Sequence, residues 1–364
     1  MKKLFLICFS FLSLHAFSQT FYTVTGKVID AETKLPLQGA SVFAQNTTIG
    51  TATDVQGNFR LQLPNGGYEL AITFVNYRSE TKRVSNTETD SKDLVIDLKQ
   101  KEKEMVDVVI RSSNEVADGW EKYGDFFLEN FIGKTTNSNQ CTIKNRDVIK
   151  FYFNKRKNRL KIMAAEPLQI ENKALGYTIK ISLDSFTHEY NSGISTYTGY
   201  PMFEEMQTTD PSQKIKWDTA RAIAYRGSIL HFMRSLYNKR LQQEGFEIQF
   251  VVNANDRDSA LKLKDFYGAM NYKMDDSTRV LDIHPNQLNV AVIYKNEVPD
   301  DTYAAANPDG NKSFELSVLT FQPGTPISIE QNGYFFDQTD LTIANYWSWE
   351  RIADMVPYDY SPPQ

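Results

Sequence analysis

Cysteine is scarce in this sequence of 364 residues, which contains only Cys8 and Cys141. Cys8 lies inside an apolar N-terminal run, so Cys141 is the only cysteine beyond that run. A single thiol forms no intramolecular disulfide, and the fold must be stabilised by burial of apolar side chains. Apolar residues make up 41% of the chain, which suffices for two domains. We interpret Cys141 itself as a buried small hydrophobe, since its sequence neighbourhood offers no sign of a reactive thiol.

The sequence motifs of common hydrolases are also missing. A zinc carboxypeptidase needs a Glu three residues after a His. Beyond the N-terminal run that position holds Asn191 after His188, Arg234 after His231 and Gln287 after His284. There is no G-x-S-x-G elbow and no Cys–His signature. We therefore predict no catalytic, cofactor-binding or metal-binding residue and no cofactor, and we interpret the chain as a non-enzyme.

Basic charge and long apolar runs are lacking too. The formal net charge is −5, so the chain has no electrostatic reason to bind nucleic acid. The longest apolar run, 4–17, is too short for a membrane span of about 20 residues. It follows Lys2 and Lys3 and precedes Ala16-Phe17-Ser18, the pattern of a signal peptide at 1–18 cleaved after Ser18. We expect an exported protein, periplasmic or associated with the outer membrane, with no transmembrane span in the mature chain. A lipoprotein is the weaker alternative, because Cys8 lies within the apolar run.

What the sequence does contain, between residues 19 and 100, is a series of short alternating strands separated by turn residues. Asp54-Val55-Gln56-Gly57 and Pro64-Asn65-Gly66-Gly67 are tight-turn sequences, since Gly accepts the positive φ that such turns need. Residues 68–77 form the longest apolar strand, and Leu94, Ile96 and Leu98 predict a last one. Strands at this spacing with no helix between them predict a small antiparallel β-sandwich.

This stretch resembles the carboxypeptidase-regulatory-like (prealbumin-like) domain of Bacteroidota cell-envelope proteins. It also resembles the N-terminal extension of TonB-dependent receptors. The resemblance implies a sandwich fold and little about activity, because it consists of turn glycines and apolar core positions. The matching positions are Gly26, Val28, Asp30, Pro36, Leu37, Gly39, Ala40, Gly50, Thr51, Thr53, Asp54, Gly57 and Phe59.

Residues 101–118 are expected to form a linker. Within it, Met105–Ile110 resembles the strand that leads to the plug in TonB-dependent receptors. No plug sequence follows, and too few residues remain for a large transmembrane barrel, so we exclude the receptor interpretation.

Residues 119–364 predict a β-rich α+β domain. Aromatic residues at helical spacing indicate a helix over 114–132, and Ser228 is a good N-cap for a second helix that Gly245 ends. Hairpins are predicted at 147–164, at 177–200 and about Asn332-Gly333, with further strands at 246–252, 280–283, 290–294 and 314–321, and a last helix at 347–355. This region resembles the bodies of other exported Bacteroidota proteins with the same N-terminal domain. That resemblance implies no activity and no site residue.

The tip of the first hairpin, 155–161, is the densest basic run. We interpret it as a solvated tip, with binding to anionic lipid headgroups or lipopolysaccharide as the alternative.

The sequence thus favours a mainly β, exported, non-catalytic envelope protein that acts as a binding or assembly module, with an envelope protein or glycan as a possible partner. Two alternatives remain open. One is an unrecognised envelope hydrolase in residues 119–364, and the other is a surface adhesin.

Overall fold

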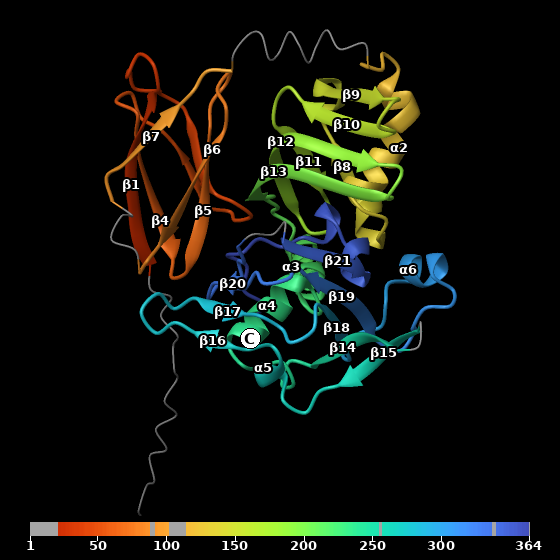
Figure 1. The fold of residues 1–364 in the computed structure, drawn as a ribbon. Helices are drawn as coiled ribbons and strands as arrows, with labels where there is room; N and C mark the ends of the chain where they lie inside the picture. The colour runs from red at the N-terminus through yellow and green to blue at the C-terminus, as the bar shows by residue number, and fades with distance from the viewer. Residues whose placement is uncertain (1–20, 88–91, 102–113, 255–256, 337–339, 364) are drawn as a thin grey trace, which may run out of the picture.

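The computed structural model describes residues 21–87, 92–101, 114–254, 257–336 and 340–363 (Figure 1). The predicted signal peptide and the predicted strand Met105–Ile110 lie outside these ranges. The described chain is mainly β and built from several antiparallel sheets, which confirms the predicted fold class. No helix of the described residues is long and apolar enough to cross a membrane.

The N-terminal region forms the predicted sandwich. One sheet has the order β4-β1-β7 and the other the order β3-β2-β5-β6. The β1–β7 pair is parallel, which alternation of apolar residues cannot reveal because it fixes faces and not directions. The strands are β1 (Phe21–Asp30), β2 (Ser41–Ala44), β3 (Gly50–Ala52), β4 (Asn58–Pro64), β5 (Gly67–Thr73), β6 (Glu80–Ser85) and β7 (Leu94–Leu98).

The turn residues of the sandwich have the predicted roles. Gly57 has φ +77°, and a Cβ there would lie 2.5 Å from the carbonyl oxygen of Val28. The Asp54 carboxylate accepts from the backbone N–H of Gln56 and of Asn58, which closes the turn. The alternating side chains of both sheets then bury one apolar cluster that includes Val28, Leu61 and Leu70.

Residues 119–205 build a six-stranded sheet covered by α2, which lies behind it in Figure 1. The order is β8-β11-β12-β10-β9, and β13 pairs with the other side of β12. The elements are α2 (Gly119–Phe131), η2 (Thr136–Gln140), β8 (Cys141–Ile143), η3 (Arg146–Val148), β9 (Ile149–Asn154), β10 (Arg159–Ala164), β11 (Leu168–Asn172), β12 (Tyr177–Glu189) and β13 (Ile194–Glu205). The predicted aromatic stripe of α2 packs on this sheet: Phe127 and Phe131 are fully buried.

The remaining residues form a second part of the body below the first in Figure 1. Its main sheet has the order β15-β14-β18-β19-β21, and a small sheet has the order β16-β17-β20. The elements are α3 (Pro211–Tyr225), α4 (Ile229–Tyr237), β14 (Phe246–Ala254), β15 (Arg257–Lys262), α5 (Phe266–Ala269), β16 (Lys273–Met274), β17 (Leu281–Ile283), β18 (Asn289–Tyr294), α6 (Asp301–Ala306), β19 (Glu315–Phe321), β20 (Ile327–Ile329), β21 (Leu341–Asn345), α7 (Tyr346–Trp349) and η5 (Ile352–Asp354).

Helices depart from the prediction more than strands do. The predicted stop of α4 at Gly245 is wrong: the helix ends at Tyr237, and Lys239 takes φ +54°. The predicted helix over 347–355 is broken into α7 and η5, because Glu350 and Arg351 are extended. The predicted domain boundaries remain a prediction, although the apolar residues do gather into separate clusters.

Candidate functional site

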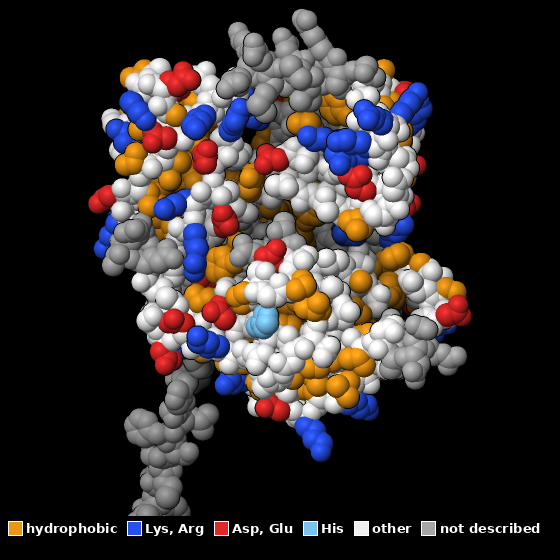
Figure 2. Space-filling view, in the orientation of Figure 1, with side chains coloured by type: hydrophobic (Ala, Val, Ile, Leu, Met, Phe, Trp, Pro, Cys, Tyr) orange, Lys and Arg blue, Asp and Glu red, His pale blue; other side chains and the backbone are white. Residues whose placement is uncertain are grey.

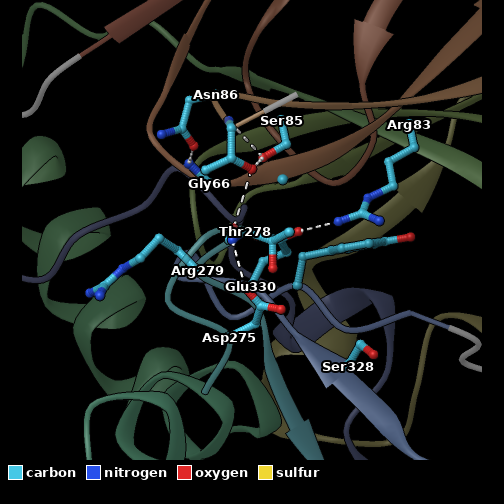
Figure 3. Close-up of polar contacts among 12 residues, drawn as sticks. Gly66, Arg83, Ser85, Asn86, Asp275, Thr278, Arg279, Ser328 and Glu330 are labelled. Carbon is cyan, nitrogen blue, oxygen red and sulfur yellow. Dashed lines mark hydrogen bonds and ion pairs between the residues drawn. The ribbon is translucent and has the colours of Figure 1, made fainter. Parts of the chain in front are cut away.

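The sandwich is joined to the body by an ion pair on a buried carboxylate. Glu330, just after β20, is 1% exposed and accepts from the guanidinium of Arg83 on β6 at 2.7 Å (Figure 3). The Arg83 guanidinium also lies 4.0 Å from the ring centroid of Phe336. A Cβ at Gly67 would come within 2.2 Å of the Glu330 carboxylate, so only glycine lets β5 approach it. This close approach fixes β5 and β6 against the body.

The hairpin predicted about Asn332-Gly333 meets the same end of the sandwich. The Asn332 amide donates to the carbonyl oxygen of Gly67 at 3.0 Å, and both groups are buried. The Tyr334 hydroxyl donates to the Glu69 carboxylate at 2.9 Å. Nearby, the Asn86 side chain accepts from the N–H of Gly66 at 3.0 Å, which holds the β4–β5 turn in place (Figure 3).

A second contact is made by the turn after β2. Thr47 forms a parallel bridge with Met202 on β13. Thr48 donates from its backbone N–H to the Asp359 carboxylate at 3.0 Å and from its hydroxyl to the other oxygen of the same group. The N–H of Tyr358 in turn donates to the carbonyl oxygen of Asn46 at 2.6 Å. The turn is therefore held between β13 and the C-terminal segment.

Arg234 on α4 connects these two contacts. Its guanidinium donates to three main-chain carbonyls: Asn332 at 2.9 Å, Tyr360 at 2.8 Å and Tyr358 at 2.7 Å. It also lies 5.4 Å from the ring centroid of Tyr225. One side chain thus positions both the hairpin that meets β5 and the segment that meets the Thr48 turn. Sequence spacing does not predict this role, because the partners of Arg234 lie about 100 residues or more away along the chain.

His231 is buried at the corner between α3 and α4. Its Nδ1 accepts from the N–H of Gly227 at 3.2 Å, so in the neutral ring Nε2 carries the proton. Nε2 faces the Glu244 carboxylate at 3.5 Å. Burial lowers the pKa of His231, and the Glu244 carboxylate opposes that shift. Neither nitrogen retains a lone pair for proton abstraction, and the arrangement is that of a structural histidine.

The other two histidines lie elsewhere. His188 is buried near the β12–β13 turn, where Nδ1 lies 2.9 Å from the Ser195 hydroxyl and the ring packs against Phe126 and Tyr190. His284 follows β17 and is exposed. No group of three or more His, Cys, Asp or Glu side chains suited to a metal ion occurs among the described residues.

The Cys141 thiol is half-buried, and burial raises its pKa to about 12. At neutral pH it is therefore protonated and a poor nucleophile. The basic hairpin tip at 155–161 is a solvated surface. Lys155, Arg156 and Lys157 are exposed, and Arg159 pairs with Glu189.

Burial raises the pKa of several carboxyl groups between residues 297 and 354, among them Glu315, Glu350 and Asp354. Glu315 at the start of β19 is 5% exposed, and burial, with Glu297 adding repulsion, raises its pKa to about 8. Burial raises the pKa of Asp354 to about 6, although Thr135 and Asn137 donate to it. Perturbed carboxyl groups of this kind occur at catalytic sites and also in structural clusters.

Replacing Glu315 by Gln should remove part of the pH dependence of stability. Folding raises the pKa of Glu315 above the ordinary value of 4.5. The contribution of this group to the stability of the folded state is therefore fully present below about pH 4.5 and is lost as the pH rises towards 8. The E315Q variant should therefore melt at a higher temperature than the wild type at pH 8.5 and at about the same temperature at pH 4.5. Thermal unfolding across this range measures the effect. The exposed Glu121→Gln serves as control, and parallel curves for E315Q and wild type would contradict the assignment.

An open depression of about 630 Å³ lies beside α5. It is lined by Lys239, Asp265, Tyr267, Gly268, Asn271 and Tyr272. The Lys239 ammonium lies 4.3 Å from the ring centroid of Tyr272, whose hydroxyl donates to the carbonyl oxygen of Tyr237. Because the lining is of mixed charge and the Tyr272 hydroxyl is already bonded, the depression indicates no specific ligand.

Comparison with known proteins identifies the sandwich alone. Residues 24–110 match the family model of the CarboxypepD_reg-like domain. TonB-dependent receptor SusC from Bacteroides thetaiotaomicron is 42% identical over 77 residues. That match covers 21% of this chain and 7% of the receptor, so the chain shares only a small part of the receptor's length.

Solved structures resemble the chain weakly. A type II cohesin–X-dockerin complex from Acetivibrio cellulolyticus is 26% identical, covers 22% of this chain and 56% of its own, and has a TM-score of 0.18. The major pilin subunit of Bacillus cereus is 11% identical. The match covers 85% of this chain and 95% of the pilin chain, with a TM-score of 0.15. The sequence match leads to one conclusion: residues 24–110, which include the N-terminal sandwich, are similar to the CarboxypepD_reg-like domain family.

Proposed function

We propose that this protein is an exported, non-catalytic binding or assembly module of the cell envelope. The observation that carries the proposal is the CarboxypepD_reg-like sandwich, together with the similarity of 77 residues of the chain to part of a TonB-dependent receptor. The signal-peptide pattern at 1–18 supports export to the periplasm or the outer membrane.

The way the sandwich is attached supports a binding role. It is held at two places, by Glu330 and by Asp359, so that sandwich and body present one continuous surface. Figure 2 shows that this surface is hollowed between the sandwich and the neighbouring six-stranded sheet. Binding sites occur preferentially where two parts of a protein meet, so we expect a partner to bind at this hollow.

The test is fractionation and crosslinking in cells that produce the tagged chain. We expect a processed protein that starts at Gln19, lies in the periplasmic or outer-membrane fraction and forms specific crosslinked species there. A matched variant without residues 4–17 should stay in the cytosol and lose those species. An unprocessed cytosolic wild-type chain would contradict the proposal.

The second candidate is an envelope hydrolase, which the raised pKa values of Glu315 and Asp354 favour. The purified mature chain should be assayed on peptides, glycans and esters. Turnover that disappears in E315Q or in Asp354→Asn, with the fold retained, would establish this candidate and displace the non-catalytic role.

A further inference from the structure

The strand β13 forms one edge of the six-stranded sheet, on the side of β12 opposite to β10 and β11. The end of this edge is covered by the sandwich. The N–H of Asn46 donates to the carbonyl oxygen of Pro201 at 2.8 Å, and the N–H of Phe203 donates to the carbonyl oxygen of Thr47 at 2.9 Å. The chain itself thus adds a short extended segment to this edge, parallel to β13.

The first half of the same edge is open. Backbone groups of alternate residues point to the same side of a strand. Since Pro201 and Phe203 point away from β12, Ser195, Tyr197 and Gly199 do so as well. Their outward N–H and C=O groups have no backbone partner among the described residues. Ile194 is 55% exposed and Tyr197 37% exposed, so the edge is accessible from solvent.

This open half lacks the usual protection of an edge strand. Natural edges carry charges, prolines or bulges that prevent pairing with another chain. The segment 194–199 reads ISTYTG and contains none of the charged residues and no proline, and the irregularity in this hairpin lies on β12. By contrast, the covered half contains Pro201 and ends in Glu204 and Glu205. The unprotected part is therefore confined to the six residues before the sandwich contact.

A cation lies beside this edge. Arg351, between α7 and η5, is half-buried and has neither an ion pair nor a side-chain hydrogen bond to a described residue. Its Cβ lies against Gly133, and its charge acts on the Tyr197 hydroxyl, whose ring packs on Phe131 at 5.2 Å. Burial lowers the pKa of Arg351, with Tyr197 opposing the shift. A carboxylate brought to this position would receive charge-assisted hydrogen bonds from the guanidinium.

We propose that the open edge of β13 binds an extended segment of a partner protein by β-strand addition, and that an acidic side chain of that segment pairs with Arg351. The inference rests on the proposed binding function and names its site and partner chemistry. Main-chain bonds to Ser195, Tyr197 and Gly199 provide affinity, as in other strand-addition complexes. Ile194 and Tyr197 provide apolar contact, and Arg351 selects for the acidic residue.

The test uses the purified mature chain and a fluorescent, end-blocked peptide of sequence TVTVE, whose residues favour the extended state. We expect saturable binding and, in NMR spectra, larger shifts for the amides of Ser195, Tyr197 and Gly199 than for those of Thr196 and Thr198, which face β12. Ser195→Pro removes one outward donor, while Ser195→Ala removes only the hydroxyl that contacts His188. The S195P variant should bind about tenfold more weakly than S195A, with the thermal unfolding of the two alike.

The charge requirement is tested separately. Arg351→Gln should weaken binding of TVTVE about fivefold and leave binding of TVTVQ unchanged. Equal binding by S195P and S195A, or no binding at millimolar peptide, would overturn the proposal. So would a dimer in light scattering that S195P abolishes, since a second copy would then occupy the edge. Failure of this assay leaves the export and crosslinking results intact, so the two proposals can fail independently.

Discussion

Replacing Arg234 by Leu is expected to lower the free energy of unfolding by about 4 kcal/mol. The guanidinium donates to three main-chain carbonyls, and each hydrogen bond to a charged group contributes about 1.5–3 kcal/mol before partial exposure is considered. Contact with the Tyr225 ring adds about 0.5–1 kcal/mol. Denaturant unfolding of the mature chain measures the loss. Hydrogen exchange at Thr48 should also accelerate, because its acceptor Asp359 lies in the segment that Arg234 holds.

The control is Arg240→Leu, three residues after the end of the same helix. The side chain of Arg240 is 59% exposed and pairs with Glu244 at 2.8 Å. Exposed pairs of this kind contribute about 0–1 kcal/mol, so this variant should change stability little. Arg234→Lys should recover only a minor part, since an ammonium cannot reach three carbonyls in the planar geometry of guanidinium. Equal stability of R234L and R240L would show that the three bonds do not hold the C-terminal segment.

The junction between sandwich and body should respond asymmetrically to loss of its two charges. Arg83→Ala is expected to cost about 3 kcal/mol, because the Glu330 carboxylate is 2% exposed at its side chain and loses this cation. Glu330→Gln should cost less, since the Arg83 side chain is 40% exposed and reaches water. Thermal unfolding of both variants measures the difference.

The double variant of Arg83 and Glu330 tests whether the buried, unpaired carboxylate causes the loss of stability in R83A. Arg83→Ala combined with E330Q removes both charges of this pair, and it should be more stable than R83A alone. If the double variant were less stable than R83A, the cost would come from lost packing on Phe336 and not from the buried carboxylate. The surface pair Lys34–Asp97, with side chains 62% and 47% exposed, offers a comparison in which K34A should have little effect.

The sequence predicts the sandwich well because its turns are encoded locally. Asp54 and Gly57 predict a turn because both residues act within a few positions of each other. The alternation of apolar and polar residues predicts the buried face of each strand. The helix α3 was missed, although Asp210 and Pro211 supply a cap and a first-turn proline. The sequence of α3 has no strong apolar stripe that would predict a helix. The helix is held instead by hydrogen bonds from Trp217 and Arg221 to backbone carbonyls of residues 173–176.

The candidate sites could not be predicted in the same way. Arg83 and Glu330 are 247 residues apart, and Thr48 and Asp359 are 311 residues apart. No periodicity or spacing rule reports such pairs, because each residue looks like an ordinary surface residue in its own segment. The open edge of β13 is of the same kind: the hairpin was predicted, but which half the sandwich covers depends on the tertiary structure.

The bonds between the Thr48 turn and Asp359 also have a consequence for the order of folding. The sandwich can form early, from contacts within about eighty residues, but this docking contact must wait until Asp359 has been synthesised. Until then the turn at 46–48 lacks this anchor, and its cover of β13 depends on its own backbone bonds to Pro201 and Phe203. The edge of β13 should therefore be held less firmly by its cover at this stage than in the native protein, and conditions that delay synthesis of the segment around Asp359 should favour aggregation.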